Sequence, residues 1–519
     1  MTATTAADTG RSQGWVLPLS VLIVGTFMSV LDTSIVNVAI PTMTTALNAS
    51  TDNIEWVVTG YTLALGTVVP LTGWLGLRIG QTRLYILGML GFAVASALCG
   101  IAWNLSTMII FRVIQAIPGG ILPVVAMTML YQIVPREKIG TAMGIYGLGV
   151  VVAPAVGPTL GGYLVEYIDW RLIYYINVPI GIVGAIAAFV VFPRIRPSSW
   201  PRLDIWGFLT VAYGLFAMLL AFSEGESWGW SGYRIMGLFV SSAISLALFA
   251  VIELEVDSPL IDLRIFKTGA YGLSLLLLSV AMTGLFSTLY FLPQFLQNIQ
   301  GLQALDAGLV MVPSAAVLVV LMPIAGRLYD VIGPKIPVAI GLAAMAYGSY
   351  LLAQLTPDTP RADIELWTSI RNLGTGLAMM PIMTAGVSAL APALTPSGSG
   401  MNNVTQRVIS SVAIAVFGGL NTTQAAQLMI DRSSLLTTGA DALPQVAAAE
   451  VKGPSGLLGL YEQLETNVTT QTYDNSFYLV ALISAAGALI ALLLMRSRTP
   501  QGAAGAHAVE IEMPTRRSA

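Results

Sequence analysis

The feature that most constrains this chain is a succession of long apolar runs separated by short polar connections. An apolar run of about 18 or more residues is typical of a membrane-spanning helix, because about 20 residues are needed to cross the hydrocarbon core. The sequence therefore predicts an all-α integral membrane protein with fourteen transmembrane helices. Their predicted bounds are 15–41, 54–76, 83–103, 107–133, 140–165, 172–192, 204–222, 234–255, 270–297, 306–326, 336–355, 364–390, 399–420 and 475–495.

The composition excludes several classes of function. The chain is 55% hydrophobic and 10% charged, whereas soluble domains carry about 25% charged residues. A net charge of -3 gives no sign of nucleic-acid binding. The single Cys99 and the single His507 leave no material for a disulfide or a His/Cys metal site. The sequence also has no Gly-Lys dipeptide, hence no Walker A nucleotide loop. We therefore expect no metal or other cofactor, and neither an enzyme nor a nucleotide-driven pump.

The basic residues predict the orientation in the membrane. Lys and Arg favour cytoplasmic connections, and most of those outside the spans fall on the side of the N-terminus. We therefore expect both termini to be cytoplasmic, in the plasma membrane of a bacterium (the inner membrane where there are two). The long polar connection 421–474 then lies outside, and we expect it to be ordered only in part.

Two stretches indicate an internal duplication. "GWLGLRIGQTR" follows the second span, and "GRLYDVIGPK" follows the tenth. Both lie in short basic turns, and transporters are often built from repeated halves. The matching positions are Gly73, Leu75 and Gly80 in the first stretch and Gly326, Leu328 and Gly333 in the second.

The duplication predicts two six-helix bundles with two extra helices between them. The expected parts are an N-terminal tail (1–14), a first bundle (15–192), the extra helices (204–255), a second bundle (270–495, including the outer connection 421–474) and a C-terminal tail (496–519).

At this point the sequence resembles a known family. "GWLGLRIGQTR" is similar to the loop motif of the major facilitator superfamily, with Gly73, Arg78, Gly80 and the following Arg83. "LDTSIVNVAIP", "RVIQAIPGG", "APAVGPTLGGYL" and "FLPQFLQNIQGLQALDAGL", in this order, resemble the fourteen-helix drug:proton antiporters of the EmrB/QacA type. The resemblance implies the major facilitator fold. It also implies multidrug efflux by alternating access, with antibiotic resistance as its outcome and the proton-motive force as its only source of energy.

The loop motif departs from the family at one position. The family's aspartate four residues after the first glycine is Leu77 here, whereas the second copy, with Gly326 and Gly333, keeps Asp330. In the family this aspartate helps to latch the two halves together on the cytoplasmic side. A latch in the first copy would therefore have to use Arg78 and Arg83 without that aspartate.

Asp32 is an acidic residue deep inside a predicted span. A charge there costs roughly 2.5 to 3.5 kcal/mol on insertion scales and normally faces a bundle interior or an aqueous cavity. Asp32 shares a small, polar helix face with Thr33 and Asn37. Burial raises the pKa of a carboxyl group and a nearby cation lowers it, so a residue in such a place can exchange a proton during transport. The alternative is a structural carboxylate that ties the first helix to a neighbour.

Arg112 is the partner expected for Asp32. It enters the fourth span at a similar depth, and Gln115 lies one turn further on the same face. In the resembling family the equivalent arginine is associated with proton coupling. The alternatives are a purely structural ion pair and an arginine that extends to the membrane surface.

The fifth span carries small residues and prolines. Its glycines are spaced for close helix packing, and its prolines should bend it. The resembling motif is associated with antiport, which favours export, although ordinary tight packing would leave the same pattern. The positions concerned are Gly157, Pro158, Gly161 and Gly162.

Polar and aromatic side chains within the spans are candidates for the substrate cavity. With few acids in the spans, recognition should rely more on apolar contact than on fixed charges. We expect lipophilic or cationic small molecules and protons as partners, in a lipid bilayer, and a monomer whose need for an accessory efflux partner is open. Other readings are an exporter of one natural product, lipid or metabolite, and a proton-coupled importer. The candidates are Asn37, Tyr61, Gln115, Tyr146, Tyr290, Gln294 and Gln297.

Overall fold

The computed structural model describes residues 14–193, 202–256, 259–434 and 454–495, and this part of the chain is helical and contains no strand. Residues 1–13 and 496–519, which include almost all of the two predicted tails, lie outside it. The first half contains α1 (Val16–Ala46), α2 (Thr51–Ile54), α3 (Trp56–Val68), α4 (Leu71–Ile79), α5 (Gln81–Gly100), α6 (Leu105–Ile133), α7 (Ile139–Tyr167), α8 (Leu172–Tyr175) and α9 (Asn177–Val191). The extra helices are α10 (Ile205–Trp228) and α11 (Tyr233–Glu255). The second half contains α12 (Gly269–Asn298), α13 (Ala304–Ile332), α14 (Lys335–Leu352), α15 (Arg361–Ser388), α16 (Thr395–Ser434) and α18 (Pro454–Leu494).

The described residues contain 12 helices that are long and apolar enough to cross a membrane. The pair α3 and α4, bent by 57°, passes the same test together and brings the number to 13. Pro70 lies at this break, where a proline cannot donate the next helical hydrogen bond.

The remaining predicted span, 364–390, corresponds to α15, which is not among the helices that pass this test. Its first half carries charged residues, including Arg371, and it packs against α12, α13 and α14. A helix covered by protein on these sides can carry polar groups that lipid would not tolerate. The number of fourteen spans therefore stays a prediction.

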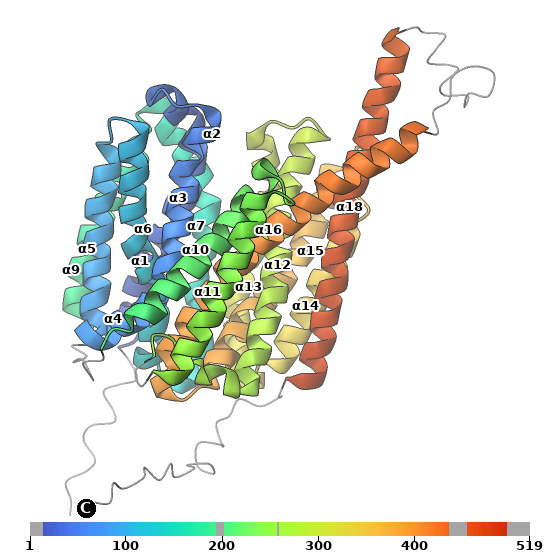
Figure 1. Ribbon diagram of the computed structural model, residues 1–519. Coiled ribbons are helices and arrows are strands. Elements are labelled where there is room, and N and C mark those ends of the chain that lie inside the picture. Colours follow the sequence, from blue (N-terminus) through green and yellow to red (C-terminus); the bar gives the residue numbers. More distant parts are fainter. Residues whose placement is uncertain (1–13, 194–201, 257–258, 435–453, 496–519) are drawn as a thin grey trace, which may run out of the picture.

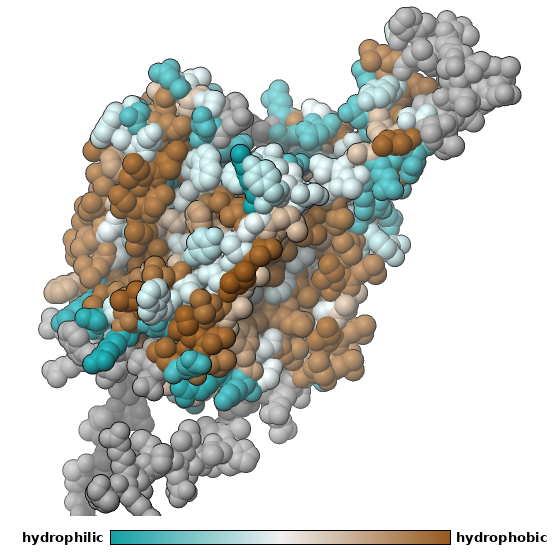
Figure 2. All heavy atoms as spheres, in the orientation of Figure 1, coloured by the Kyte–Doolittle hydropathy of each residue, from teal (hydrophilic) through white to brown (hydrophobic). Residues whose placement is uncertain are grey.

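The helices form two groups with α10 and α11 across their front (Figure 1). α10 and α11 pack against each other, and α10 also contacts α3 of the first half and α16 of the second. We call the end of the bundle where α1 begins and α18 ends the inner end, and the opposite end the outer end. Figure 2 shows apolar side chains over the middle of the visible face, with hydrophilic residues gathered towards the two ends.

The two copies of the duplicated turn end their helices in the same way. α4 ends at Gly80, with a φ of 89°, and α13 ends at Gly333, with a φ of 80°. Residues with a side chain rarely adopt such a backbone conformation, whereas glycine adopts it readily. The matched glycines thus reverse the chain at the inner end in both halves.

The connection 421–474, expected to be a loop, is helical at both of its ends. α16 continues to Ser434 and α18 begins at Pro454, and both extend beyond the bundle (Figure 1). Asn475 donates to Gln424 over 3.1 Å, and Ser476 donates to Asn421 over 2.7 Å, which ties the two helices together. These segments are more polar than the predicted spans, and hydropathy along the sequence predicted a connection there instead of helix.

Candidate functional site

Asp32 of α1 and Arg112 of α6 form an ion pair inside the first half. Arg112 Nη1 donates to Asp32 Oδ2 over 2.5 Å, and the side chains of Arg112 and Asp32 are 1% and 0% exposed, respectively. The start of α6 is fixed by a capping box in which the Asn104 side chain accepts from the Thr107 N–H over 2.8 Å. This cap sets the depth at which α6 presents Arg112 to α1, and the contact is the one expected from the sequence.

Three further polar side chains surround this pair. Gln115 Nε2 and Asn177 Nδ2 each donate to Asp32 Oδ1 over 2.9 Å. Gln115 also accepts from Arg112 Nη1 over 2.7 Å and donates to Ser96 Oγ over 2.7 Å. Gln115, expected in the substrate cavity, is 0% exposed and instead belongs to the surroundings of the ion pair.

Asn177 and Ser96 were not among the sequence candidates. Asn177 opens α9 within the apolar stretch "YINVPIG", and Ser96 lies near the outer end of α5. A carboxamide inside an apolar segment is the signal that could have identified Asn177, because such a group needs a hydrogen-bonding partner when it is buried. Ser96 carries no comparable signal, since serines are common in membrane helices.

Aromatic rings enclose the guanidinium of Arg112. It lies 4.0 Å from the centre of the Tyr61 ring and 5.6 Å from that of Tyr174. Its Nε donates to the Val57 carbonyl over 3.2 Å. The cation is therefore bound by one carboxylate, one amide, one carbonyl and two π faces, and it is shielded from water.

This arrangement can hold a charge that depends on a proton. With Asp32 ionised, the pair is neutral as a whole and both carboxylate oxygens accept hydrogen bonds. A proton on Asp32 would leave the Arg112 charge without its partner, and breaking a buried pair costs about 3 to 5 kcal/mol. Protonation therefore favours a rearrangement that gives Arg112 another partner or water.

The two other arginines inside predicted spans have a different environment. Arg371 of α15 is 1% exposed; it donates to the carbonyl of Gly284 and, over 3.1 Å, to Asn372 Oδ1. Arg407 of α16 is partly exposed. Among the described residues neither forms an ion pair, since the two ion pairs found there are Asp32 with Arg112 and Asp262 with Arg264.

The remaining cavity candidates do not gather at one place. Tyr61 is buried over Arg112, and the hydroxyl group of Tyr146 is 3.1 Å from that of Thr26, in the interior of the first half. Tyr146 and Tyr61 therefore act within the first half in this structure. In the outer half of the bundle, Gln294 is partly exposed, and Asn37, Tyr290 and Gln297 are exposed.

Asp330 joins the two halves at the inner end. Its Oδ1 accepts from the Gly140 N–H over 2.8 Å, and its Oδ2 accepts from the Thr141 N–H over 2.8 Å and the Thr141 hydroxyl over 2.6 Å. Gly140 and Thr141 are in the first turn of α7, whose free N–H groups and positive dipole end favour a carboxylate. Asp330 of the second half thus caps a helix of the first.

Among the described residues, the first copy of the duplicated turn shows no equivalent cap. Leu77 is 37% exposed, Arg83 is exposed, and the Arg78 guanidinium lies 5.1 Å from the Trp74 ring. A Cβ on Gly73 would lie 3.8 Å from the Leu260 carbonyl, which belongs to the segment after α11. This segment also contacts α16, because the Asp262 N–H donates to Ser397 Oγ over 3.2 Å.

The small residues of α7 serve two contacts. Near the inner end, Gly140 packs so closely against Gly326 of α13 that a Cβ on either would strike the other's carbonyl. Further out, Gly157 and Gly161 pack against Ser34 and Ile35 of α1. A Cβ on Gly162 would meet nothing within 4 Å, and the side chain of Pro158 lies outside the described residues.

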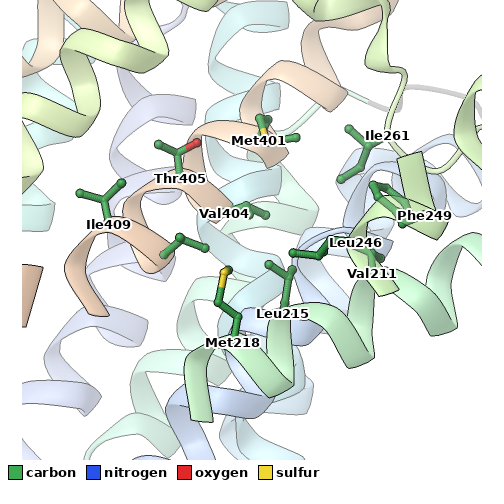
Figure 3. Close-up of a pocket in the computed structure, with 11 residues that line it drawn as sticks. Val211, Leu215, Met218, Leu246, Phe249, Ile261, Met401, Val404, Thr405 and Ile409 are labelled. Carbon is green, nitrogen blue, oxygen red and sulfur yellow. The ribbon is translucent and has the colours of Figure 1, made fainter. Parts of the chain in front are cut away.

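An apolar cavity of about 310 Å³ lies between α10, α11 and α16 (Figure 3). Thr405 supplies the one hydroxyl among its lining residues, and sequence analysis did not anticipate it. The cavity exists because the extra helices lie against α16, a contact that no local pattern reveals. Its lining comprises Val211, Leu215, Met218, Leu246, Phe249, Ile261, Met401, Val404, Thr405, Val408 and Ile409.

Comparisons with known proteins agree with this architecture. A family model described as the Major Facilitator Superfamily matches residues 22–414. The MFS-type transporter YhcA of Bacillus subtilis (strain 168) is 38% identical over 79% of this chain and 77% of its own length. A "Multidrug resistance protein B homolog" of Mycobacterium tuberculosis (strain ATCC 25618 / H37Rv) is 32% identical over 78% of this chain and 76% of its own.

The fold is also found among solved structures. The proton:xylose symporter XylE superposes with a TM-score of 0.58 at 12% identity, covering 91% of this chain and 95% of that one. At this identity the likeness concerns the fold alone. The family match, in contrast, covers most of the chain at the level of sequence. The chain therefore belongs to the major facilitator superfamily, whose members are membrane transporters and not enzymes.

Proposed function

We propose that this protein exports lipophilic small molecules of several chemical types from the cell in exchange for protons. The proton gradient is its only source of energy, it binds no cofactor, and it works as a monomer with both termini in the cytoplasm. The name of the mycobacterial relative, a multidrug resistance protein, supports efflux over uptake.

The observation that carries the proposal is the enclosed pair of Asp32 and Arg112. A transporter driven by protons needs a group whose charge changes and a reason for the protein to respond to that change. Asp32 supplies the first, and the unpaired charge left on Arg112 supplies the second. Gln115 and Asn177 each donate a hydrogen bond to the carboxylate.

The contacts at the inner end support alternating access. The inner half of α7 is held against α13 by Asp330 and by close backbone contacts at Gly140 and Gly144. The outer half of α7 packs against α1 of its own half instead. These contacts fit a state closed at the inner end, from which Asp32 would take up a proton from outside.

The test is transport in inverted membrane vesicles with a panel of unrelated lipophilic compounds. We expect an imposed pH gradient to drive their accumulation by the unmodified protein. Asp32→Asn should insert and bind compounds but lose the gradient-driven part, because an amide carries no exchangeable charge. Asp358→Asn, at an exposed position between α14 and α15, is the matched control and should transport normally.

Two outcomes would overturn the proposal. Unchanged coupling in the Asp32→Asn variant would remove this residue from the mechanism. Accumulation of a single solute, with no response to the rest of the panel, would favour a specific exporter of one natural product, lipid or metabolite.

A further inference from the structure

α16 has two faces of opposite character. Asn403, Gln406, Arg407 and Ser410 are spaced by three or four residues, so they share one face of the helix. All four are partly exposed. The opposite face includes Val404 and lines the apolar cavity (Figure 3). The polar face is therefore directed away from that cavity.

The polar face of α16 meets the first half of the protein. α16 packs against α6, and the guanidinium of Arg407 is close enough to Tyr61 for the two groups to interact electrostatically. Tyr61 in turn covers Arg112, with 4.0 Å between ring centre and guanidinium carbon. Tyr61 is therefore near both Arg407 and the ion pair of Asp32 with Arg112.

The charge of Arg407 lacks a counter-charge of its own in the part of the chain that the structure describes. Among the described residues no carboxylate forms an ion pair with Arg407, and Asp32 is already bound by Arg112. A cation in a membrane helix is costly and is normally paired or functional. Part of the Arg407 residue is exposed, so α16 does not cover it completely.

One acid beside α16, Glu226 of α10, lies far from Arg407. Glu226 of α10 approaches Gly418, where a Cβ would be 3.9 Å from its Oε2. Gly418 is eleven residues beyond Arg407 along α16, which is about 16 Å at 1.5 Å per residue. In the second half, Arg371 adds another charge that has no ion-pair partner among the described residues. The middle of the protein therefore carries excess positive charge.

We propose that the polar face of α16 binds the negatively charged group of a lipophilic substrate, with Arg407 as the residue that binds it. The inference rests on the proposed function and deepens it by naming the substrate class: lipophilic anions with a carboxylate, sulfonate or phenolate group. It departs from the cationic compounds expected from the sequence. A cation at this place would meet the repulsion of Arg407 without an available acid.

The chemistry of the side chains fits this class. The guanidinium group offers a planar fork of donors that matches a carboxylate with two parallel hydrogen bonds. Asn403, Gln406 and Ser410 supply neutral donors on the same face. In a site that excludes bulk water, such charge-assisted bonds are stronger than bonds between neutral groups.

The charge of the substrate also changes the energetics of export. In a one-for-one exchange, a proton entering and a monovalent anion leaving both move charge in the direction that an inside-negative potential favours. A neutral substrate moves the charge of the proton alone, and a monovalent cation moves no net charge. Transport of the anion should therefore respond most strongly to the membrane potential.

The experiment compares three compounds of matched shape: naphthylacetate, its primary amide, and a naphthylethyl trimethylammonium salt. Binding is measured on the full chain in lipid nanodiscs, independently of any gradient. We expect the carboxylate to bind most tightly and Arg407→Gln to weaken its binding at least tenfold, the effect of one lost hydrogen bond to a charged group. Binding of the amide should change much less.

Two further variants separate charge from shape and from general damage. Arg407→Lys keeps the charge but loses the planar fork, so it should restore part of the binding of the carboxylate. Arg361→Gln removes an exposed arginine at the start of α15 and should bind all three compounds as the unmodified protein does.

The outcomes keep the two proposals apart. Tighter binding of the ammonium compound, or unchanged carboxylate binding in Arg407→Gln, would overturn the anion site whatever the transport result. Selective carboxylate binding that Arg407→Gln abolishes supports it, even if a pH gradient drives no transport, a result that would count against the proposed function alone. In proteoliposomes, greater sensitivity to membrane potential for the carboxylate than for the amide supports both.

Discussion

The carboxylate of Asp330 in α13 lies 2.8 Å from the main-chain nitrogen of Gly140 in α7, across the interface between the two halves. It accepts two more hydrogen bonds from Thr141 in the same turn. A helix of one half thus begins on a side chain of the other. This relationship makes Asp330, together with the close backbone contacts at Gly140 and Gly144, one of the contacts that hold α7 against α13.

Replacing Asp330 should loosen the inner end. Asp330→Ala removes three bonds to a charged acceptor, and even one such bond contributes about 1.5 to 3 kcal/mol, a tenfold or larger change in the ratio of closed to open forms. Spin labels on Glu137→Cys and Val331→Cys would report the change as longer distances. The native Cys99 is buried and should not take up the label. Asp358→Asn should leave the distances unchanged. The same distribution in Asp330→Ala would show that other contacts close this end.

Gly144 should be sensitive for a steric reason. A Cβ there would strike the Met322 carbonyl and lie 2.8 Å from the Cα of Pro323, both of them backbone atoms of α13 that cannot turn away. We expect Gly144→Ala to separate α7 from α13, to lengthen the same label distances and to slow transport. Since Gly144 contacts the other half, the first half should keep its own packing. Normal distances together with normal transport would contradict this reading.

Gly161 and Gly162 form a matched pair on α7. A Cβ on Gly161 would lie 2.8 Å from Ile35 Cγ1 and 3.1 Å from the Ile35 carbonyl, whereas one on Gly162 would meet nothing within 4 Å. Gly161→Ala should therefore reduce thermal stability by about 1 to 3 kcal/mol, as overpacking does. Gly162→Ala should be neutral or slightly stabilising, because alanine is the better helix former. Thermal unfolding in detergent would separate them, and equal melting temperatures would refute the prediction.

The Asp32 and Arg112 pair should show strong non-additivity. Arg112→Gln leaves a buried carboxylate without its cation and should cost about 3 to 5 kcal/mol of stability. The double variant Asp32→Asn with Arg112→Gln removes both charges and should recover much of that loss, although it should not couple transport to protons. A complete double-mutant cycle by thermal unfolding measures the coupling. Additive losses would mean that the two charges do not stabilise each other.

The depth of charged residues predicted the centre of the site but not its surroundings. Asp32 and Arg112 stand out because a charge in a span needs a partner at its own depth. Asn177 and Ser96 reach the pair from α9 and α5, and their contribution depends on how the helices pack, which a hydropathy pattern does not contain. Gln115 was selected for the right helix face, yet it contacts the ion pair instead of a cavity.

The fold could be predicted best for helices that face lipid, because lipid requires apolar residues on their outer surface. It was predicted less well for helices that protein covers. Helices such as α12 are easily recognised as spans in the sequence, because their outer surfaces need apolar residues. α15 packs against α12, α13 and α14 and can carry Arg371, so its sequence looks less like a span. The extensions of α16 and α18 lie beyond the bundle, and the sequence was read there as a polar connection instead of helix (Figure 1).

The positions that form the cap on α7 differ in how well they tolerate mutation. Two of the three donors to Asp330 are main-chain N–H groups of Gly140 and Thr141, and every amino acid except proline supplies such a group. Changes at Thr141 can therefore remove a hydroxyl but seldom the cap, while almost any change at Asp330 removes it whole. A library of random variants should therefore tolerate most changes at Thr141 but few at Asp330, and few at Gly140, where any Cβ would strike the Gly326 carbonyl.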